Sequence, residues 1–150
     1  MQRRTLIAGS AAAPAAAAAS RALPMTTPMT IEPIAPTDPA YAQASLVTGA
    51  TRWLYVSGQV PADADGHVPA DYPSQYRLAW RNVETQLRAA GMDFDNLVKV
   101  TIFLSDRALI AQSAGLRQAV LGDRSPALTI VIAGIYDSAW LLEIEAVAAA

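Results

Sequence analysis

The stretch that decides the fold of this chain reads Leu97-Val98-Lys99-Val100-Thr101-Ile102-Phe103-Leu104-Ser105-Asp106. Apolar side chains from Val98 to Leu104 alternate with Lys99, Thr101 and Phe103, a period of two that is typical of a strand. One face of this strand is fully apolar, so we expect it to lie at the centre of a sheet. Two further stretches carry the candidate site: Val56-Ser57-Gly58-Gln59-Val60-Pro61 before it and Leu142-Glu143-Ile144-Glu145-Ala146-Val147 after it.

The residues before this strand predict three more strands and a loop. Prolines at positions 28, 33 and 36 restrict a first strand, around Ile31–Ile34, to the edge of a sheet. The next two strands, Ala44–Val47 and Arg52–Gln59, are predicted to form a hairpin through Thr48-Gly49-Ala50-Thr51, where glycine favours the turn. A polar loop follows at 61–73.

Two helices and two last strands complete the pattern. Apolar residues at spacings of three and four predict a helix over Ser74–Ala90, with Gly91 as its C-terminal cap. Ser105 or Asp106 is predicted to cap a second helix that ends at Leu121, with these residues on its inner face: Leu109, Ser113, Leu116 and Val120. Strands are expected at Ala127–Ala133 and Trp140–Val147. The order predicts an α+β fold, a mixed sheet with two helices on one face, whose open face needs a partner copy.

The first 24 residues have a different character from the rest. Arg3-Arg4 precedes a short Ala-rich run with small residues near Ala19 and Ala22, a pattern that resembles a twin-arginine export signal followed by a tether. We therefore expect residues 25–150 to form one domain and the mature protein to be periplasmic. The apolar run is too short for a membrane span. A second interpretation stays open: translation from Met25 would give a cytoplasmic protein.

Charge and residue usage exclude several function classes. Residues 1–24 carry three of the 11 basic residues and none of the 13 acidic ones, so the remainder has a formal net charge of −5. This acidic body without a basic stripe argues against nucleic acid as a partner. The chain has no cysteine, and its single histidine, His67, has only Asp63 and Asp65 nearby in sequence, which is too few ligands for a zinc site. No metal is expected, and no serine has triad partners.

Ordered motifs over Tyr41–Val147 resemble the Rid family, the YjgF-like proteins also labelled endoribonuclease L-PSP. Beyond the three stretches quoted above, the matching segments are Tyr41-Ala42-Gln43-Ala44, Asn82, Leu87-Arg88-Ala89-Ala90-Gly91 and Pro126-Ala127-Leu128-Thr129. The resemblance implies a chorismate-mutase-like, YjgF-like fold assembled as a homotrimer, with small metabolites bound in clefts between subunits. It also implies imine or enamine deamination without any cofactor.

One residue departs from that family's deaminases. They carry an arginine after Pro-Ala that grips the substrate carboxylate, and this chain has Leu128 there. Leucine offers no charge and no donor, which removes a contact worth about 1.5–3 kcal/mol. Arg124, four residues earlier, either replaces that contact or is a solvated surface charge. The family's water-orienting glutamate matches Glu143, which either acts in the site or belongs to an acidic strand face with Glu145.

Other site candidates keep two interpretations each. Ser57, Gly58 and Gln59 form a turn where the backbone approaches a ligand, a bulge that ends the strand, or both. Tyr41 either closes the ligand cleft with its hydroxyl or packs at the start of a strand.

Three functions follow. The chain is an imine or enamine deaminase with Glu143 as the catalytic residue, or a non-catalytic metabolite-binding trimer whose cleft is made more apolar by Leu128. The third, an endoribonuclease, is disfavoured by the acidic charge.

The export signal predicts a processed N-terminus. Edman sequencing or mass spectrometry of the protein purified from its host is expected to find a chain that starts after the small residues near Ala19 or Ala22. A protein that begins at Met25 would contradict export.

Overall fold

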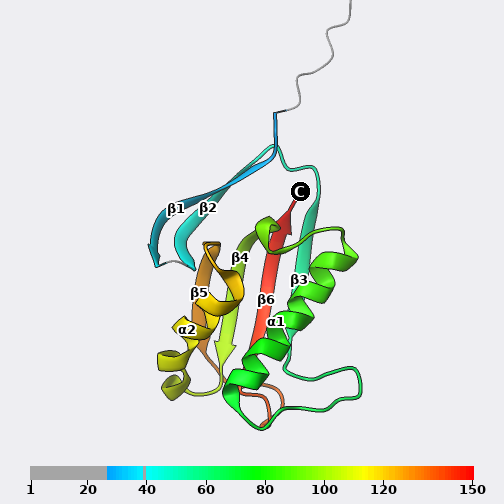
Figure 1. Ribbon diagram of the computed structural model, residues 1–150, viewed down its shortest axis with the longest axis vertical. Coiled ribbons are helices and arrows are strands. Elements are labelled where there is room, and N and C mark those ends of the chain that lie inside the picture. The colour runs from blue at the N-terminus through cyan, green and yellow to red at the C-terminus, as the bar shows by residue number, and fades with distance from the viewer. Residues whose placement is uncertain (1–26, 39) are drawn as a thin grey trace, which may run out of the picture.

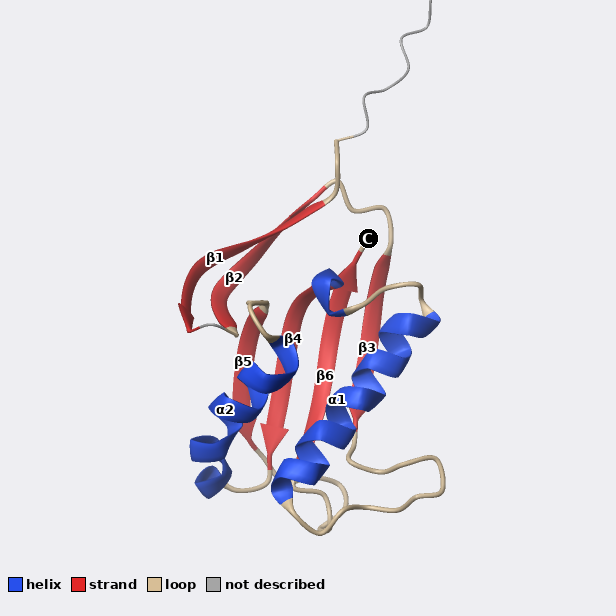
Figure 2. Cartoon of the chain, viewed as in Figure 1, coloured by secondary structure: helices blue, strands red, loops and turns tan. Residues whose placement is uncertain are grey.

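A computed structural model describes residues 27–38 and 40–150, which form a mixed sheet with two helices packed on one face (Figures 1 and 2). The helices are α1 (Tyr72–Ala89) and α2 (Ile110–Leu121). The strands are β1 (Thr30–Asp38), β2 (Tyr41–Thr48), β3 (Trp53–Gln59), β4 (Leu97–Leu104), β5 (Ala127–Ile132) and β6 (Leu142–Ala149). The predicted α+β class is confirmed. The predicted export signal lies outside the described residues.

The sheet places β4 at its centre. The strand order is β1-β2-β5-β4-β6-β3, so β4 pairs in parallel with β5 and antiparallel with β6. This confirms the central position expected from the alternation of β4. It also confirms β1, with its prolines, as an edge strand.

The predicted hairpin between the second and third strands is wrong. β2 pairs with β1 and β5, whereas β3 lies at the far edge of the sheet and pairs with β6. The C-terminal strand takes the hydrogen bonds that the hairpin needed: the amides of Thr51 and Arg52 both donate to the Ala150 carbonyl at 2.8 Å. The turn signal at Gly49 serves another purpose. A Cβ there would lie 2.6 Å from the Thr27 carbonyl oxygen, so glycine lets two backbone segments approach closely.

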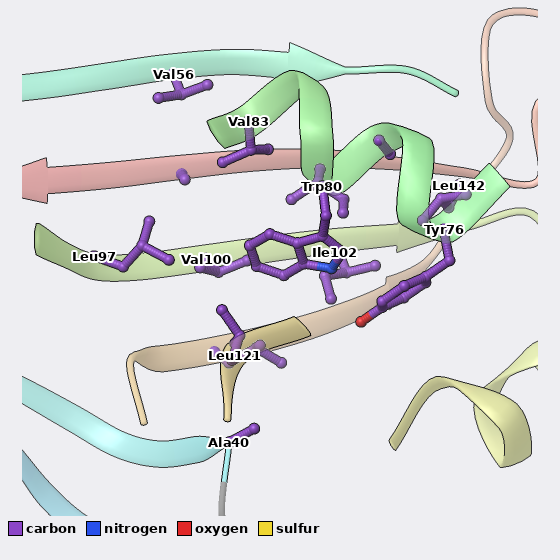
Figure 3. Packing of buried hydrophobic residues seen from close by; sticks show 14 of the residues in the cluster. Ala40, Val56, Tyr76, Trp80, Val83, Leu97, Val100, Ile102, Leu121 and Leu142 are labelled. Atoms are coloured by element: carbon purple, nitrogen blue, oxygen red, sulfur yellow. The ribbon is translucent and has the colours of Figure 1, made fainter. Parts of the chain in front are cut away.

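The core lies between the sheet and the helices (Figure 3). Val100, Ile102 and Leu104 of β4 are completely buried, and Tyr76 and Trp80 of α1 cover them. Trp80 also meets Phe94 edge to face, with ring centroids 5.7 Å apart. The alternation of β4 therefore points its apolar side chains at the helices and the intervening side chains at the open face.

Element boundaries follow local hydrogen bonds that the apolar spacing does not reveal. α1 begins two residues earlier than predicted because the carboxylate of Asp71 accepts from the Ser74 amide at 2.9 Å, with proline in the first turn. Asp106 caps a short 3₁₀ turn, Arg107–Leu109, and α2 itself starts at Ile110. The last strand begins at Leu142 instead of Trp140.

The sheet face away from the helices carries large apolar side chains. Tyr55 of β3 is 76% exposed, and Trp53 and Val131 are also exposed. This is the uncovered face that the sequence predicts. None of the helices in the described part of the chain is long and apolar enough to cross a membrane.

The N-terminal cap of α1 predicts a pH-dependent contribution to stability. The hydrogen bond from the Ser74 amide lowers the pKa of Asp71 below its usual 3.8. Stabilisation by this carboxylate is therefore present above that value and is lost as pH falls through the lower native pKa. Asp71→Ala is expected to lower the urea midpoint at pH 7, with the difference from wild type disappearing near pH 2.

A matched control is Asp65→Ala, which removes an exposed loop carboxylate. The midpoint of this variant should equal that of wild type at both pH values. An equal loss of stability for Asp71→Ala at low and neutral pH would contradict the role of the charged cap.

Candidate functional site

Glu143 lies directly against Gly58. In β6, Leu142 and Ile144 are buried under the helices, so Glu143 between them points to the open face, opposite Phe103 of β4. An ideal Cβ added to Gly58 would be 1.6 Å from Oε1 of Glu143 and 2.5 Å from its Cδ. Only glycine leaves room for the carboxylate in this position.

A bulge in β3 creates this contact. Val56 pairs with Ala146 and Gln59 with Ile144, so two residues, Ser57 and Gly58, oppose a single residue of β6. The Gln59 side-chain amide donates to the Ser57 carbonyl at 3.0 Å and supports the bulge. Of the two alternatives for this segment, the bulge is present, and the close approach that Gly58 allows here is to the side chain of Glu143.

Asn82 of α1 holds the chain that leaves this bulge. Its side-chain amide donates to the carbonyls of Val60 and Ala62, both at 2.9 Å. Sequence analysis noted Asn82 only as part of a motif. Its position beside the buried Val83 on α1 is the signal that could have identified it as a partly buried polar anchor.

Tyr41 and Leu128 share a second hollow, on the other side of β4. It has a volume of about 460 Å³ and is also lined by Arg117, Thr129 and Ile130. Leu128 is 8% exposed and lies opposite Val100 of β4, so it belongs to the core beneath the helices. β2 pairs with β5 at one register position, Ala42 with Ala127, which leaves the edge of β5 open beside this hollow.

Arg117 is a residue that sequence analysis did not consider for the site. It lies on α2 and is 5% exposed, on the inner helix face with Ser113 and Leu121. The spacing of four between these three residues could have identified it as an inward-facing cation. A guanidinium has five N–H donors, so it can keep a contact within the chain and still donate to a ligand.

Arg124 lies elsewhere in the molecule. Its Nε donates to the carboxylate of Asp95 at 2.5 Å and its Nη1 to the Leu121 carbonyl at 3.2 Å. It lines a separate hollow with Ile31 and Pro33. Within one chain, the structure does not bring Arg124 to the hollow of Tyr41 and Leu128.

The candidate residues thus form two groups in a single chain. Leu128 points to the helix-covered face of the sheet, whereas Glu143 points to the open face, and β4 lies between their strands. Ser57 joins the open-face group, where it lines a hollow of about 310 Å³ with Lys99, Thr101 and Glu145.

Lys99 is the cation of this open face. Its ammonium group donates to Thr129 Oγ1 at 2.6 Å and to the Val100 carbonyl at 3.1 Å. Partial burial lowers the pKa of Lys99, and the nearby carboxylate of Glu145 opposes that shift.

In the loop around His67, the side chain of Asp63 accepts hydrogen bonds from backbone amides. Asp63 Oδ1 accepts from the amides of Asp65 and His67 at 3.0 and 2.8 Å. In residues 27–38 and 40–150, no three histidine or acidic side chains come together as a metal cluster.

The close approach of Gly58 and Glu143 predicts a coupled pair of substitutions. Gly58→Ala is expected to destabilise the protein because its methyl group displaces the carboxylate. Glu143→Ala removes the obstruction, so the double variant should be more stable than the sum of the two losses predicts, by about 0.5–3 kcal/mol in urea unfolding. Additive losses would contradict the contact.

Gly115→Ala is the matched control for this cycle. A Cβ there meets nothing within 4 Å, in the middle of α2. This change should raise the free energy of unfolding by about 0.5–1 kcal/mol, through helix propensity alone.

Comparisons with known proteins agree with this geometry. "Protein mmf2, mitochondrial" from Schizosaccharomyces pombe is 35% identical over 99 residues, 64% of this chain and 79% of that protein. A 2-iminobutanoate/2-iminopropanoate deaminase from Rattus norvegicus is 42% identical over 69 residues, 45% of this chain and 48% of that enzyme. A Rid-family protein of unknown function from Yersinia pestis, YyfB, shares the fold, with a TM-score of 0.66 at 24% identity over 75% of this chain and 88% of that one.

The family match covers every helix and strand of the described residues. Residues 30–150 match the family described as endoribonuclease L-PSP, from β1 to the end of the chain. The aligned region includes the bulge of β3, the central strand and Glu143. The chain therefore belongs to the endoribonuclease L-PSP family, the Rid or YjgF family of the resemblance found in its sequence.

Proposed function

We propose that this protein hydrolyses small imines or enamines to carbonyl compounds and ammonia. The observation that carries the proposal is the position of Glu143, whose carboxylate is packed against Gly58 on the open face of the sheet. Relatives of this chain are named as deaminases of 2-imino acids and of reactive intermediates, which supports the same chemistry.

Glu143 is suited to the proton transfers of imine hydrolysis. Its carboxylate accepts a proton from water as the water oxygen bonds to the imine carbon, and the C=N electron pair moves to nitrogen. Glu143 passes this proton to the nitrogen, which gives a carbinolamine. The hydroxyl proton then moves to the amine nitrogen, and collapse of this intermediate restores C=O and expels ammonia. Water is the only co-reactant. The bulge at Ser57 and Gly58 limits the freedom of the carboxylate, which lowers the entropic cost of this alignment.

The complete cleft is proposed to form between copies in a homotrimer. Within one chain, Glu143 points to the open face of the sheet and Leu128 to the helix-covered face. A neighbouring copy that packs against the exposed Trp53 and Tyr55 face would cover apolar surface and supply the missing half. This arrangement agrees with the trimers known for the family.

Leu128 changes what the cleft can hold. An apolar side chain at this position gives no grip on a carboxylate. The nearest cation in the same hollow is Arg117, whose several donors allow a contact with a substrate carboxylate from the helix side. We therefore propose that Arg117 of α2 binds the carboxylate of those substrates that carry one.

A second candidate function is a trimer that binds a small metabolite without catalysis. It is favoured by one observation: Leu128 is buried in the hydrophobic core instead of presenting a polar group to the cleft. Ribonuclease activity has less support, because the chain has a formal charge of −2 and RNA binding relies on cations that neutralise phosphates.

The test is ammonia and carbonyl release from freshly generated 2-iminopropanoate, measured with residues 25–150. Wild-type protein is expected to accelerate hydrolysis, and Glu143→Gln to lose about 100-fold or more because the amide cannot accept the proton. Glu145→Gln is the matched control, since this exposed acid lies on the same strand and face.

Two further variants separate the candidate functions. Leu128→Arg restores the family's side chain, and Arg117→Lys keeps the charge but loses the planar fork. Hydrolysis by wild type that falls with Arg117→Lys supports the proposed grip. Hydrolysis by Leu128→Arg alone would overturn the deaminase proposal in favour of the binding trimer.

A further inference from the structure

Another hollow lies on the helix side of the sheet, away from the open face that carries Glu143. It lies against α1, with a volume of about 320 Å³, and Val120 of α2 contributes to its wall. Its apolar lining comes from Trp80, Phe94, Val120 and Pro69. Phe94 forms the accessible aromatic floor, and the buried ring of Trp80, which is 1% exposed, supports it edge to face at 5.7 Å. Its volume and lining match the small-molecule sites of other proteins.

Two arginines stand at the edge of this floor. Arg77 and Arg81 line the hollow and are one helical turn apart on α1, so their side chains project from the same helix face. Both are exposed. Arg77 donates a long hydrogen bond, 3.4 Å from its Nη2 to the Ser74 hydroxyl. A guanidinium held this loosely remains available to an anion.

The one acidic residue of the lining is already compensated. Glu84 accepts from Arg88 through both Nη2, at 2.6 Å, and Nε, at 3.1 Å. Its charge is therefore offset by a residue outside the hollow. The hollow keeps the two positive charges of Arg77 and Arg81, although the chain as a whole is acidic.

We propose that this hollow binds a small carboxylate with a flat apolar body, such as an aryl or short-chain acid. The apolar body lies on Phe94 and Val120, and the carboxylate accepts hydrogen bonds from Arg77 and Arg81. A guanidinium fork matches a carboxylate in shape and charge. The aromatic floor selects the apolar body, and the arginine pair selects the anion. This site is separate from the cleft of the proposed deaminase and does not depend on it.

The experiment is a titration of ¹⁵N-labelled protein, residues 25–150, with phenylacetate and with the neutral phenylacetamide. Phenylacetate is expected to shift amide signals around residues 77–84, 94 and 120, and to bind at least tenfold more tightly than the amide. Arg77→Gln and Arg81→Gln should each weaken phenylacetate binding by about three- to tenfold, because each removes a charge-assisted bond.

Two variants control for charge and for the other site. Arg107→Gln removes one positive charge outside the hollow and should leave the dissociation constant unchanged. Glu143→Gln should also leave it unchanged. Equal binding of acid and amide, shifts that map to the open sheet face, or no shifts at millimolar ligand would each overturn the proposal.

Discussion

The alternation of side chains along β4 is the constraint on which the rest of the molecule depends. Val100, Ile102 and Leu104 are completely buried beneath the helices, which forces Lys99, Thr101 and Phe103 to the opposite face. Neighbouring strands inherit this division through their register. Leu128 is paired with Val100 and enters the core, while Glu143 is paired with Phe103 and remains on the open face. The alternation along the strands therefore places the core residues on one face of the sheet and Glu143 on the other.

The consequence for the site is that one residue cannot serve both roles. Leu128 contributes apolar packing to the core, and its side chain has no charge or hydrogen-bond donor to offer an anion. The positively charged residue in that hollow is Arg117, which lies on the inner face of α2.

Glycine has two different uses in the same chain. At Gly49 the absence of a side chain lets two backbone segments approach closely. At Gly58 it makes room for the carboxylate of Glu143. The second use links a bulge in β3 to the orientation of an acid in β6, which come from residues 85 positions apart. The orientation of the Glu143 carboxylate therefore depends on a close approach between two strands.

Local pattern was sufficient for the secondary structure and the class of fold. The period of two in β4, the helical spacing before Gly91 and the prolines of β1 identified the central strand, α1 and the edge strand, because each reports on which side of a local element is buried. Motifs also identified Gly58 and Glu143 as candidates. The cap at Asp71 shifted the start of α1 by two residues, since a hydrogen bond and not apolar spacing sets that boundary.

Long-range pairing was decided only by the tertiary structure. Sequence joined β2 to β3 as a hairpin, yet β3 pairs with the C-terminal strand, because the backbone of Ala150 competes for the same hydrogen bonds. The contact of Gly58 with Glu143, the place of Arg117 beside Leu128 and the separation of Arg124 from both arise in the same way. Sequence alone determined which faces of each element are apolar. Which elements meet depends on how strands distant in the chain satisfy one another's hydrogen bonds, and no local periodicity records that choice.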